Sequence, residues 1–341
     1  MKKQSFLLLL LSFFLLLFIL TACSNSKENS VVVYTSVDRN YSEPIFKSFE
    51  KETGIKVLAV YDVEATKTTG LVNRLINEKE NPKGDVFWNG EIIQTIKLKD
   101  NNILEVYKSK NNTTLLDKYI DPDGYYTSFG GRLKVFIVNT DILKKSNYPR
   151  SIYDVISDKN DLSKVAIPKP LFGTTATYAA ALYSKLGIDN AHNFFLKASN
   201  SKLNIVDGNS QVKNLVSSGK IVYGLTDSDD ALSAIKKGLP VEIVFPDQNE
   251  DMIGTLLIPN SVALIKNSPN KTNGEIFIDY LLEINTLNNL IDSGWCQVSL
   301  RNIKVSNSFD ISKIKLIDIS FEEIYNVFND SSSDMADLFI K

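Results

Sequence analysis

The sequence predicts an α/β fold of two lobes joined by a two-strand hinge. From residue 31 onward, short apolar strand patterns alternate with amphipathic helical patterns, which is typical of parallel sheets covered by helices. About 320 residues follow a distinct N-terminal segment, more than one hydrophobic core usually organises. Two extended segments flanked by turn residues, 137–141 and 259–264, fit two chain crossings, and a hinge between α/β lobes creates a ligand cleft.

The N-terminal segment predicts export and lipid attachment. Two lysines follow Met1, and residues 6–20 form an apolar run that is too short to span a membrane. The segment ends in LTAC at 20–23, which resembles the lipobox of bacterial lipoproteins. We therefore expect residues 1–22 to be a lipoprotein signal peptide, Cys23 to be lipidated, and residues 23–30 to form a polar tether. A plain cleaved signal and an uncleaved anchor are the alternatives.

The first lobe is expected to begin with a β-α-β-α-β unit. The predicted strands are residues 31–34, 55–60 and 85–88, and the predicted helices are residues 41–53 and 69–77. Gly54 directly follows the last apolar-periodic residues of the first helix and marks its end. Because the connections are short, the strands should be parallel, with helices on both faces of the sheet.

The same alternation continues through the rest of the chain. It predicts strands at residues 134–138, 165–167, 221–225 and 262–265, and helices at residues 178–186 and 211–218, before the pattern becomes mainly helical. We expect residues 31–137 to form the first part of the first lobe and residues 138–259 to form the second lobe. Residues 260–341 should return to the first lobe and add C-terminal helices.

Charge and rare residues exclude several classes of protein. The chain has 38 basic and 40 acidic residues, a formal net charge of -2 and no basic run interleaved with aromatic residues, so nucleic acid is not an expected partner. His192 is the only histidine, which excludes a histidine metal site and predicts a surface role. With Cys23 lipidated, Cys296 has no partner, and it is expected to be a buried, inert thiol rather than a reactive one.

Residues 171–177 predict a site for an anion. Gly173, Thr174 and Thr175 precede a helix, so free backbone N–H groups and two hydroxyls would gather at its N-terminus. An ordinary helix cap is the alternative. Arg132, in a glycine-rich approach to a strand, is a second candidate donor to a bound anion, or else a partner in a surface salt bridge.

Acidic and phenolic side chains follow the predicted strands of the first lobe. Asp38 and Tyr41 come after the first strand, Glu91 follows the third, and residues 61–64 place Tyr61, Asp62 and Glu64 after the second. In open α/β sheets the carboxyl ends of the strands line the ligand crevice. Carboxylate and phenolate oxygens suit a hard cation such as ferric ion. A solvated position is the alternative for each of these side chains.

Three aspartates follow the strand at 221–225. Asp227, Asp229 and Asp230 could ligate a hard cation, favour the N-terminus of the next helix through its macrodipole, or bind the ammonium group of an organic ligand. Asn209, in the turn before the helix at 211–218, either faces the cleft or caps that helix.

Several short motifs, in this order and spacing, resemble the extracellular solute-binding proteins described as ferric-iron-binding components of ABC importers. They are VYTS at 33–36, FEKETGIKV at 49–57, DVFWNGE at 85–91, GGRLKV at 130–135, IVNT at 137–140 and FGTTAT at 172–177. The resemblance covers nearly all of the mature chain to about Trp295. It implies the periplasmic-binding-protein fold with two hinge crossings, type II.

The resemblance also implies roles for individual residues. It adds Ser36 to the candidate ligand-binding groups, makes Glu91 an acidic iron ligand, and assigns to residues 173–175 the anion that is bound with the metal. The chain departs from the family after the strand at 221–225. Iron binders of this family carry adjacent tyrosines there, whereas this chain reads TDSDD at 226–230, which puts the iron ligand set in question.

Together these features predict a monomeric, lipid-anchored receptor on the extracytoplasmic face of a membrane, either periplasmic or at the cell surface. It would deliver a small ligand to ABC permease and ATPase subunits. Ferric iron, held by Glu91, Asp229 and Asp230 with a synergistic anion, is the first expected ligand. A phosphorylated or phosphonate-type organic anion is the second. A carboxylate-based hydrolase and a purely structural lipoprotein remain as other classes, but no nucleophile–base motif predicts an enzyme, a catalytic residue or a catalytic cofactor.

Overall fold

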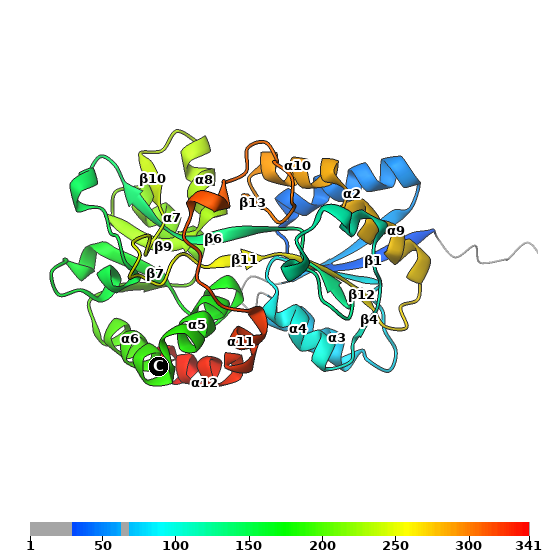
Figure 1. Cartoon of the computed structure of the whole chain (residues 1–341), viewed down its shortest axis with the longest axis horizontal. Helices are drawn as coiled ribbons and strands as arrows, with labels where there is room; N and C mark the ends of the chain where they lie inside the picture. Colours follow the sequence, from blue (N-terminus) through cyan, green and yellow to red (C-terminus); the bar gives the residue numbers. More distant parts are fainter. Residues whose placement is uncertain (1–28, 63–67, 341) are drawn as a thin grey trace, which may run out of the picture.

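The computed structural model describes residues 29–62 and 68–340 and consists of two α/β lobes that lie side by side (Figure 1). The predicted signal peptide, Cys23 and Glu64 lie outside the described residues. Within the described ranges, no helix combines the length and the apolar character that crossing a membrane requires. The predicted division into two α/β lobes is confirmed (Figure 1).

The first lobe is built on a six-stranded mixed sheet. The strands, in spatial order, are β2 (Lys56–Tyr61), β1 (Ser30–Thr35), β3 (Val86–Asn89), β12 (Ser261–Ile265) and β4 (Leu104–Glu105), with β5 (Tyr126–Thr127) also paired to β12. Strands β1, β2 and β3 are parallel, as the short connections predict, and β12 runs antiparallel to β3. The carboxyl ends of β1, β2 and β3 therefore share one edge of the sheet.

Five helices cover this sheet. They are α2 (Arg39–Thr53), α3 (Thr69–Asn77), α4 (Ile93–Asp100), α9 (Lys271–Leu281) and α10 (Ile284–Ser293). Helix α2 ends where the sequence predicts, because Gly54 takes the left-handed conformation (φ 69°) and its N–H bonds to Glu50 O at 2.9 Å. Ile45, Phe46 and Phe49 form the buried face of this helix.

The second lobe contains a seven-stranded sheet. Its strands, in spatial order, are β10 (Val241–Val244), β6 (Gly130–Asn139), β9 (Tyr223–Asp227), β7 (Val165–Pro168) and β8 (Asn204–Val206), with β11 (Leu257–Pro259) and β13 (Val298–Ser299) also paired to β6. Its helices are α5 (Gly173–Leu186), α6 (Ile188–Asn200), α7 (Asn209–Ser217) and α8 (Ser228–Lys236). Strands β7, β8 and β9 are parallel, and helices α5, α7 and α8 begin at their carboxyl ends.

Two neighbouring strand segments connect the lobes, and the chain passes to the second lobe once more after α10. One runs from β5 in the first sheet into β6 in the second, and the other runs from β11 in the second sheet into β12 in the first. The predicted boundary between residues 259 and 260 falls between β11 and β12. The predicted boundary after Ile137 falls inside β6 instead, because β6 pairs with its second-sheet neighbours from Gly130 onward. Because β6 is paired along its length and buried on both faces, it is not interrupted at Ile137.

Two apolar layers extend across both lobes, one on each face of the sheets. Alternate residues of β6 divide between them: Leu133, Val135 and Ile137 join the layer that contains residues of α2, α7, α8, α9 and α10. Phe136 and Val138 join the layer that contains residues of α3, α4, α5 and α6. The period-2 alternation within one strand therefore links the cores of the two lobes at the crossing.

The C-terminal segment contacts both lobes. Helices α11 (Phe321–Asn326) and α12 (Phe328–Phe339) follow an irregular stretch, and α12 packs on α5 and α6 of the second lobe (Figure 1). Helix α11 packs on α5 and also on α4 of the first lobe. The ring of Phe321 lies 6.4 Å from that of Tyr119, while the Lys185 ammonium donates to Asp318 O on the other side. The C-terminus thus does not simply return to the first lobe.

Candidate functional site

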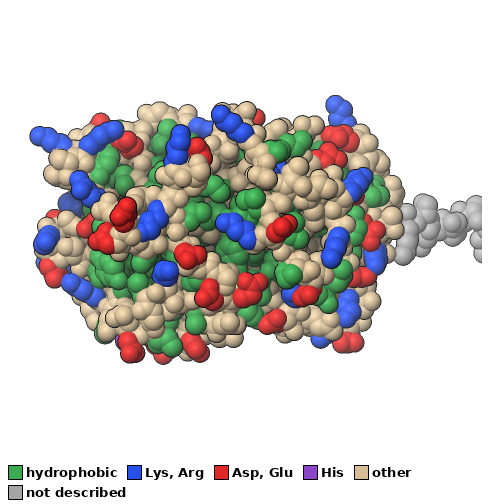
Figure 2. All heavy atoms as spheres, viewed as in Figure 1, with side chains coloured by type: hydrophobic (Ala, Val, Ile, Leu, Met, Phe, Trp, Pro, Cys, Tyr) green, Lys and Arg blue, Asp and Glu red, His purple; other side chains and the backbone are tan. Residues whose placement is uncertain are grey.

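Polar side chains of the two lobes meet beside the crossing strands. On the face shown in Figure 2, hydrophobic side chains are exposed along the middle of the molecule, with basic and acidic side chains next to one another around them. Among the hydrogen bonds that join the lobes, Thr177 Oγ1 of α5 donates to Glu91 Oε2 at 3.0 Å, and Arg132 Nη2 donates to Gly90 O at 3.1 Å. These contacts identify the junction at which a ligand between the lobes would bind.

Glu91 lies between the carboxyl end of β3 and the start of helix α4. Its carboxylate accepts the N–H groups of Ile93 at 2.7 Å and Gln94 at 3.0 Å, so it satisfies donors that have no partner within the helix. Burial raises the pKa of Glu91, and hydrogen bonds from Gln94, Thr177, Asn89 and Ile93 oppose that rise. Glu91 therefore both starts a helix and contacts the opposite lobe.

Ser36 and Gly90 shape the first-lobe side of the junction. Ser36 Oγ donates to Asn89 Oδ1 at 2.6 Å and accepts the N–H of Gly90 at 3.0 Å, which fixes the turn after β3. A Cβ atom on Gly90 would lie 2.6 Å from Arg132 Nη2, so a larger residue at this position would displace the guanidinium. Asp38 precedes the first residue of α2, and its charge acts on the Arg132 guanidinium.

Arg132 connects Asp229 of the second lobe to the first lobe. Its Nη1 atom lies 2.8 Å from Asp229 Oδ2, and its side chain is 16% exposed. Burial acts to lower the pKa of Arg132. The charges of Asp229, Asp227, Asp38 and Asp230 outweigh burial, so the pKa lies above its usual range. The arginine is thus a permanently charged donor surrounded by carboxylates.

Asp229 is the carboxylate with the least complete set of partners at the junction. Its Oδ2 atom pairs with Arg132, whereas the buried Oδ1 atom has no hydrogen-bond partner among the described residues. Burial raises the pKa of Asp229 to about 7, although Arg132 acts in the opposite direction. The backbone amide of Asp230 also acts to lower this pKa, but it forms no hydrogen bond with Oδ1.

Lys134, itself fully buried, is the centre of a second cluster. Its ammonium lies 2.9 Å from Asp227 Oδ1, 2.9 Å from Asn209 Oδ1 and 3.2 Å from Thr175 Oγ1. The other oxygen of Asp227 accepts hydrogen bonds from Thr174 Oγ1 and from Asn209 Nδ2. The structure therefore brings together four of the residues that the sequence predicts as ligand-binding.

Sequence reasoning did not select Lys134 as a site residue, although a signal was present. It stands between Leu133 and Val135 in a strand whose other side chains are largely apolar. A lysine buried at such a position requires an acidic partner. That partner, Asp227, lies 93 residues away in the sequence, so the pairing becomes visible only in the fold.

Three helices of the second lobe begin around this cluster. The N-terminal residues of α5, α7 and α8 supply Thr174 and Thr175, Asn209, and Ser228, while Asp227 directly precedes α8. The first backbone hydrogen bond of α5 is donated by Ala176 to Phe172 O, so the N–H groups before Ala176 are not used within the helix. Converging N-termini produce a positive potential that favours an anion.

The structure does not bring the predicted metal ligands Glu91, Asp229 and Asp230 together as one set. Glu91 binds the start of α4, Asp229 pairs with Arg132, and Asp230 accepts hydrogen bonds from Lys213 at 3.0 Å and Ser210 at 2.9 Å. Within residues 29–62 and 68–340, no three acidic, histidine or cysteine side chains are grouped as a metal site. In this conformation these carboxylates are held by separate partners.

Cys296 and His192 take no polar part in these clusters. Cys296 is a free, buried cysteine, and burial raises the pKa of its thiol. His192 is on α6, where its Nδ1 atom lies 2.9 Å from Asp334 Oδ2 of α12. The histidine thus links two helices of the second lobe.

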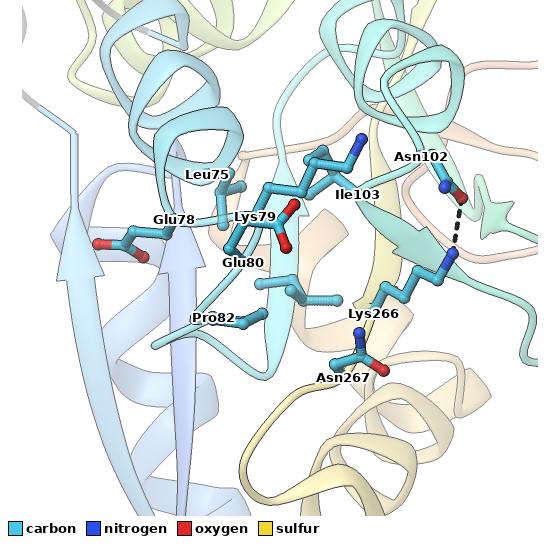
Figure 3. A pocket seen from close by; sticks show the side chains of 10 residues that line it. Leu75, Glu78, Lys79, Glu80, Pro82, Asn102, Ile103, Lys266 and Asn267 are labelled. Carbon is cyan, nitrogen blue, oxygen red and sulfur yellow. Dashed lines mark hydrogen bonds between the residues drawn. The ribbon is translucent and has the colours of Figure 1, made fainter.

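A separate cavity of about 220 Å³ lies in the first lobe (Figure 3). It is lined by Leu75, Glu78, Lys79, Glu80, Pro82, Asn102, Ile103, Ile265, Lys266 and Asn267. The ammonium of Lys266 donates to Asn102 Oδ1 at 2.8 Å at one side of this cavity. It contains none of the residues that meet at the junction, so its position does not support a role in binding between the lobes.

Comparison with known proteins identifies relatives of the same architecture. The chain is 23% identical over 281 residues to a Salmonella typhimurium periplasmic protein described as a candidate 2-aminoethylphosphonate-binding protein, with 80% of each chain covered. It superposes with a TM-score of 0.80 on the apo ferric ion-binding protein A of Pasteurella haemolytica, at 20% identity, covering 91% of this chain and 98% of that one.

A further similar structure was determined with an organic ligand. It is the periplasmic binding protein AfuA of Actinobacillus pleuropneumoniae with exogenous fructose-6-phosphate bound, which has a TM-score of 0.78 and 22% identity, covering 91% of this chain and 98% of that chain. A family model described as "Bacterial extracellular solute-binding protein" matches residues 34–283. The two-lobed fold and this match together show that the chain belongs to the bacterial extracellular solute-binding protein family.

Proposed function

We propose that this solute-binding protein captures a small organic anion with a phosphate or phosphonate group and delivers it to an ABC permease and its ATPase. The observation that carries the proposal is the convergence of three helix N-termini, those of α5, α7 and α8, on Lys134 and Asp227, with Arg132 paired to Asp229 in the first turn of α8. Backbone N–H groups and helix dipoles favour an anion, and a guanidinium binds phosphate oxygens in a bidentate manner.

Similar proteins support this class of ligand. The Salmonella relative is described as a candidate binder of 2-aminoethylphosphonate, and the Actinobacillus structure holds fructose-6-phosphate. Both ligands end in a tetrahedral phosphorus group with several acceptor oxygens. Around Lys134, the side chains of Thr174, Thr175 and Asn209 carry hydroxyl and amide groups of the type that donate to such oxygens. Thr174 and Asn209 now donate to Asp227.

Binding would favour the closed arrangement of the lobes. Glu91 and Gly90 of the first lobe already contact Thr177 and Arg132 across the junction. A ligand that bonds to both sides adds interactions present only when the lobes are together, and this differential affinity shifts the population toward the closed state. The permease would then recognise that shape. The proposed role is binding alone, without catalysis.

Ferric iron is the second candidate ligand, and one observation favours it. Tyr41 of α2 is close enough to the second lobe that, after burial, the charges of Asp229 and Asp230 are the next causes that raise its pKa. A phenol and two carboxylates are oxygen donors of the kind that a hard cation takes. Iron would have to displace Arg132 from Asp229 and Lys213 from Asp230.

We also propose the location of the protein. Lipidation at Cys23 would hold it on the extracytoplasmic face of a membrane, with residues 23–30 as the tether. A family of extracellular solute-binding proteins is consistent with that side of the membrane. The receptor would act as a monomer, since one chain supplies both lobes and the junction between them.

Isothermal titration of the signal-free protein tests the proposed ligand class. Ethylphosphonate and glucose 6-phosphate should bind, and Arg132→Gln should weaken both by about tenfold or more, because a charge-assisted bond contributes about 1.5–3 kcal/mol. The exposed Arg150 provides a matched control, and Arg150→Gln should bind as the wild type does. Binding of ferric citrate with no binding of either organic anion would contradict the proposal.

A further inference from the structure

Each of the three aspartates at the start of α8 has one cationic partner. Asp227 is matched by Lys134 at 2.9 Å, and Asp230 is matched by Lys213 at 3.0 Å. Asp229 is matched by Arg132 at 2.8 Å, but this guanidinium also donates to Gly90 O of the first lobe. Asp229 therefore shares its cationic partner with the opposite lobe.

Asp229 has an unused acceptor inside the protein. The residue is 7% exposed, and its Oδ1 atom is buried without a hydrogen-bond partner among the described residues. A buried carboxylate oxygen without a partner costs free energy, so such atoms are rare in folded proteins unless something else binds them. The remaining acceptor needs a donor that this part of the chain does not supply.

The neighbours of Asp229 come from both lobes and include aromatic rings. The Arg132 guanidinium lies 5.8 Å from the centre of the Trp295 ring, which packs edge-on against Trp88 at 5.6 Å. Tyr41 of the first lobe is close enough for its phenol to be affected by Asp229. Asp229 thus lies where groups of both lobes come together.

A bound anion would compete with Asp229 for the positive charge of Arg132. If a phosphate or phosphonate group binds Arg132, the guanidinium that now pairs with Asp229 is shared with the ligand. A positive group on the same ligand would restore the balance by donating to Asp229 Oδ1. A neutral or purely anionic ligand would leave the buried carboxylate with less compensation.

We infer that Asp229 Oδ1 accepts a hydrogen bond from a cationic amino group of the ligand, so that the receptor selects zwitterions with an ammonium group and a phosphate or phosphonate group. This inference rests on the proposed function, because the same molecule must occupy the anion side of the junction. Asp229 is then the residue that distinguishes amino-bearing ligands from ligands that lack the amine.

Matched ligand pairs test the inference. The pairs are 2-aminoethylphosphonate with ethylphosphonate, and 2-aminoethyl phosphate with ethyl phosphate, each titrated into the wild type and Asp229→Asn. The wild type should bind the amino member of a pair about tenfold or more tightly. Asp229→Asn should bind the two members of a pair with about equal affinity, because its affinity for the amino member falls. Its affinity for the member without an amine should stay within about threefold of the wild-type value.

The matched control is Asp158→Asn, whose carboxylate is 86% exposed and pairs with Lys197 on the surface of the second lobe. It should keep the wild-type preference, and unchanged circular dichroism of both variants excludes misfolding. Equal binding of both members of a pair by the wild type would overturn the role of Asp229 and leave the proposed ligand class intact. Binding of ferric citrate alone, with none of the four organic ligands, would overturn both.

Discussion

Lys134 Nζ lies 2.9 Å from Asp227 Oδ1, and the two side chains are 0% and 2% exposed. The pair connects β6, the long strand of the second lobe that begins at the crossing, with the last residue of β9, where α8 begins. Asn209 and Thr175 complete the coordination of the ammonium. This buried ion pair fixes the positions of the N-termini of α5, α7 and α8 around the Lys134 ammonium.

Loss of the Lys134 ammonium should strongly destabilise the second lobe. Lys134→Met keeps most of the side-chain volume but leaves Asp227 buried without its cation, which typically costs about 3–5 kcal/mol. Urea unfolding of the signal-free protein measures this change. Lys197→Met, which removes an exposed ion pair with Asp158, is the control and should change stability by less than about 1 kcal/mol. Equal stability of the two variants would show that the buried pair has no structural role.

Removal of the Thr177 hydroxyl should favour the open arrangement of the lobes. Thr177→Val preserves the shape of the side chain but deletes the 3.0 Å hydrogen bond to Glu91 across the junction, a bond to a carboxylate that contributes about 1.5–3 kcal/mol. Small-angle scattering of the ligand-free variant should give a larger radius of gyration than the wild type. Thr177→Ser retains the hydroxyl and should behave like the wild type. The same radius for all three proteins would remove this bond from the closure mechanism.

The stability of the ligand-free protein should depend on pH through Asp229. Burial raises the pKa of this carboxyl to about 7 in the folded state, whereas an unfolded chain has the ordinary value near 3.9. Between about pH 4 and pH 7 the folded state retains a proton that the unfolded state has lost, so the folded state loses relative stability as pH rises. The groups that act on Asp229 are Arg132, Asp230, Asp227, Tyr41 and Cys296.

Asp229→Asn should abolish this dependence. The unfolding free energy of the variant, relative to the wild type, should increase between pH 5 and pH 8, because asparagine resembles the neutral acid at every pH. Urea titrations of both proteins without ligand at the two pH values measure the difference. A difference that stays constant, or that moves in favour of the wild type at pH 8, would contradict the pKa shift.

The C-terminal helix should detach when Asp334 is removed. Its carboxylate accepts a hydrogen bond from Tyr183 of α5 and lies 2.9 Å from His192 Nδ1 of α6, so one side chain ties α12 to two helices. Asp334→Ala should increase hydrogen exchange across residues 328–339 and destabilise the protein by about 1–3 kcal/mol. Asp337→Ala, on the exposed side of the same helix, is the control. Unchanged exchange in Asp334→Ala would show that packing alone holds α12.

Much of the fold could be predicted because it depends on local patterns. Helix α3 occupies residues 69–77 as its apolar spacing indicates, and Gly54 ends α2 because it adopts a positive φ angle. The strand crossing could be located only in part. A strand buried on both faces has no polar alternation to mark where it changes lobe, so the predicted boundary after Ile137 lies within β6.

The candidate site could be predicted only where local chemistry carries the information. Thr174 and Thr175 before α5 suggest a helix N-terminus with free donors, and the structure places them there. The partner of each charged residue depends on the tertiary fold. Arg132 and Asp229 are 97 residues apart, and Glu91 and Thr177 are 86 apart, so their contacts leave no mark on the local sequence.

The central claim is that an organic phosphate or phosphonate, rather than iron, binds between the lobes. A thermal-shift titration of the signal-free wild type with 2-aminoethylphosphonate, glucose 6-phosphate and ferric citrate tests it most directly, with the visible absorption recorded in parallel. A ligand at 100 times its Kd stabilises the native state by about 2.7 kcal/mol. We predict an increase in Tm with at least one of the two organic ligands, none with ferric citrate, and no visible band. An increase in Tm with ferric citrate alone, accompanied by a visible charge-transfer band from Tyr41, would contradict the account.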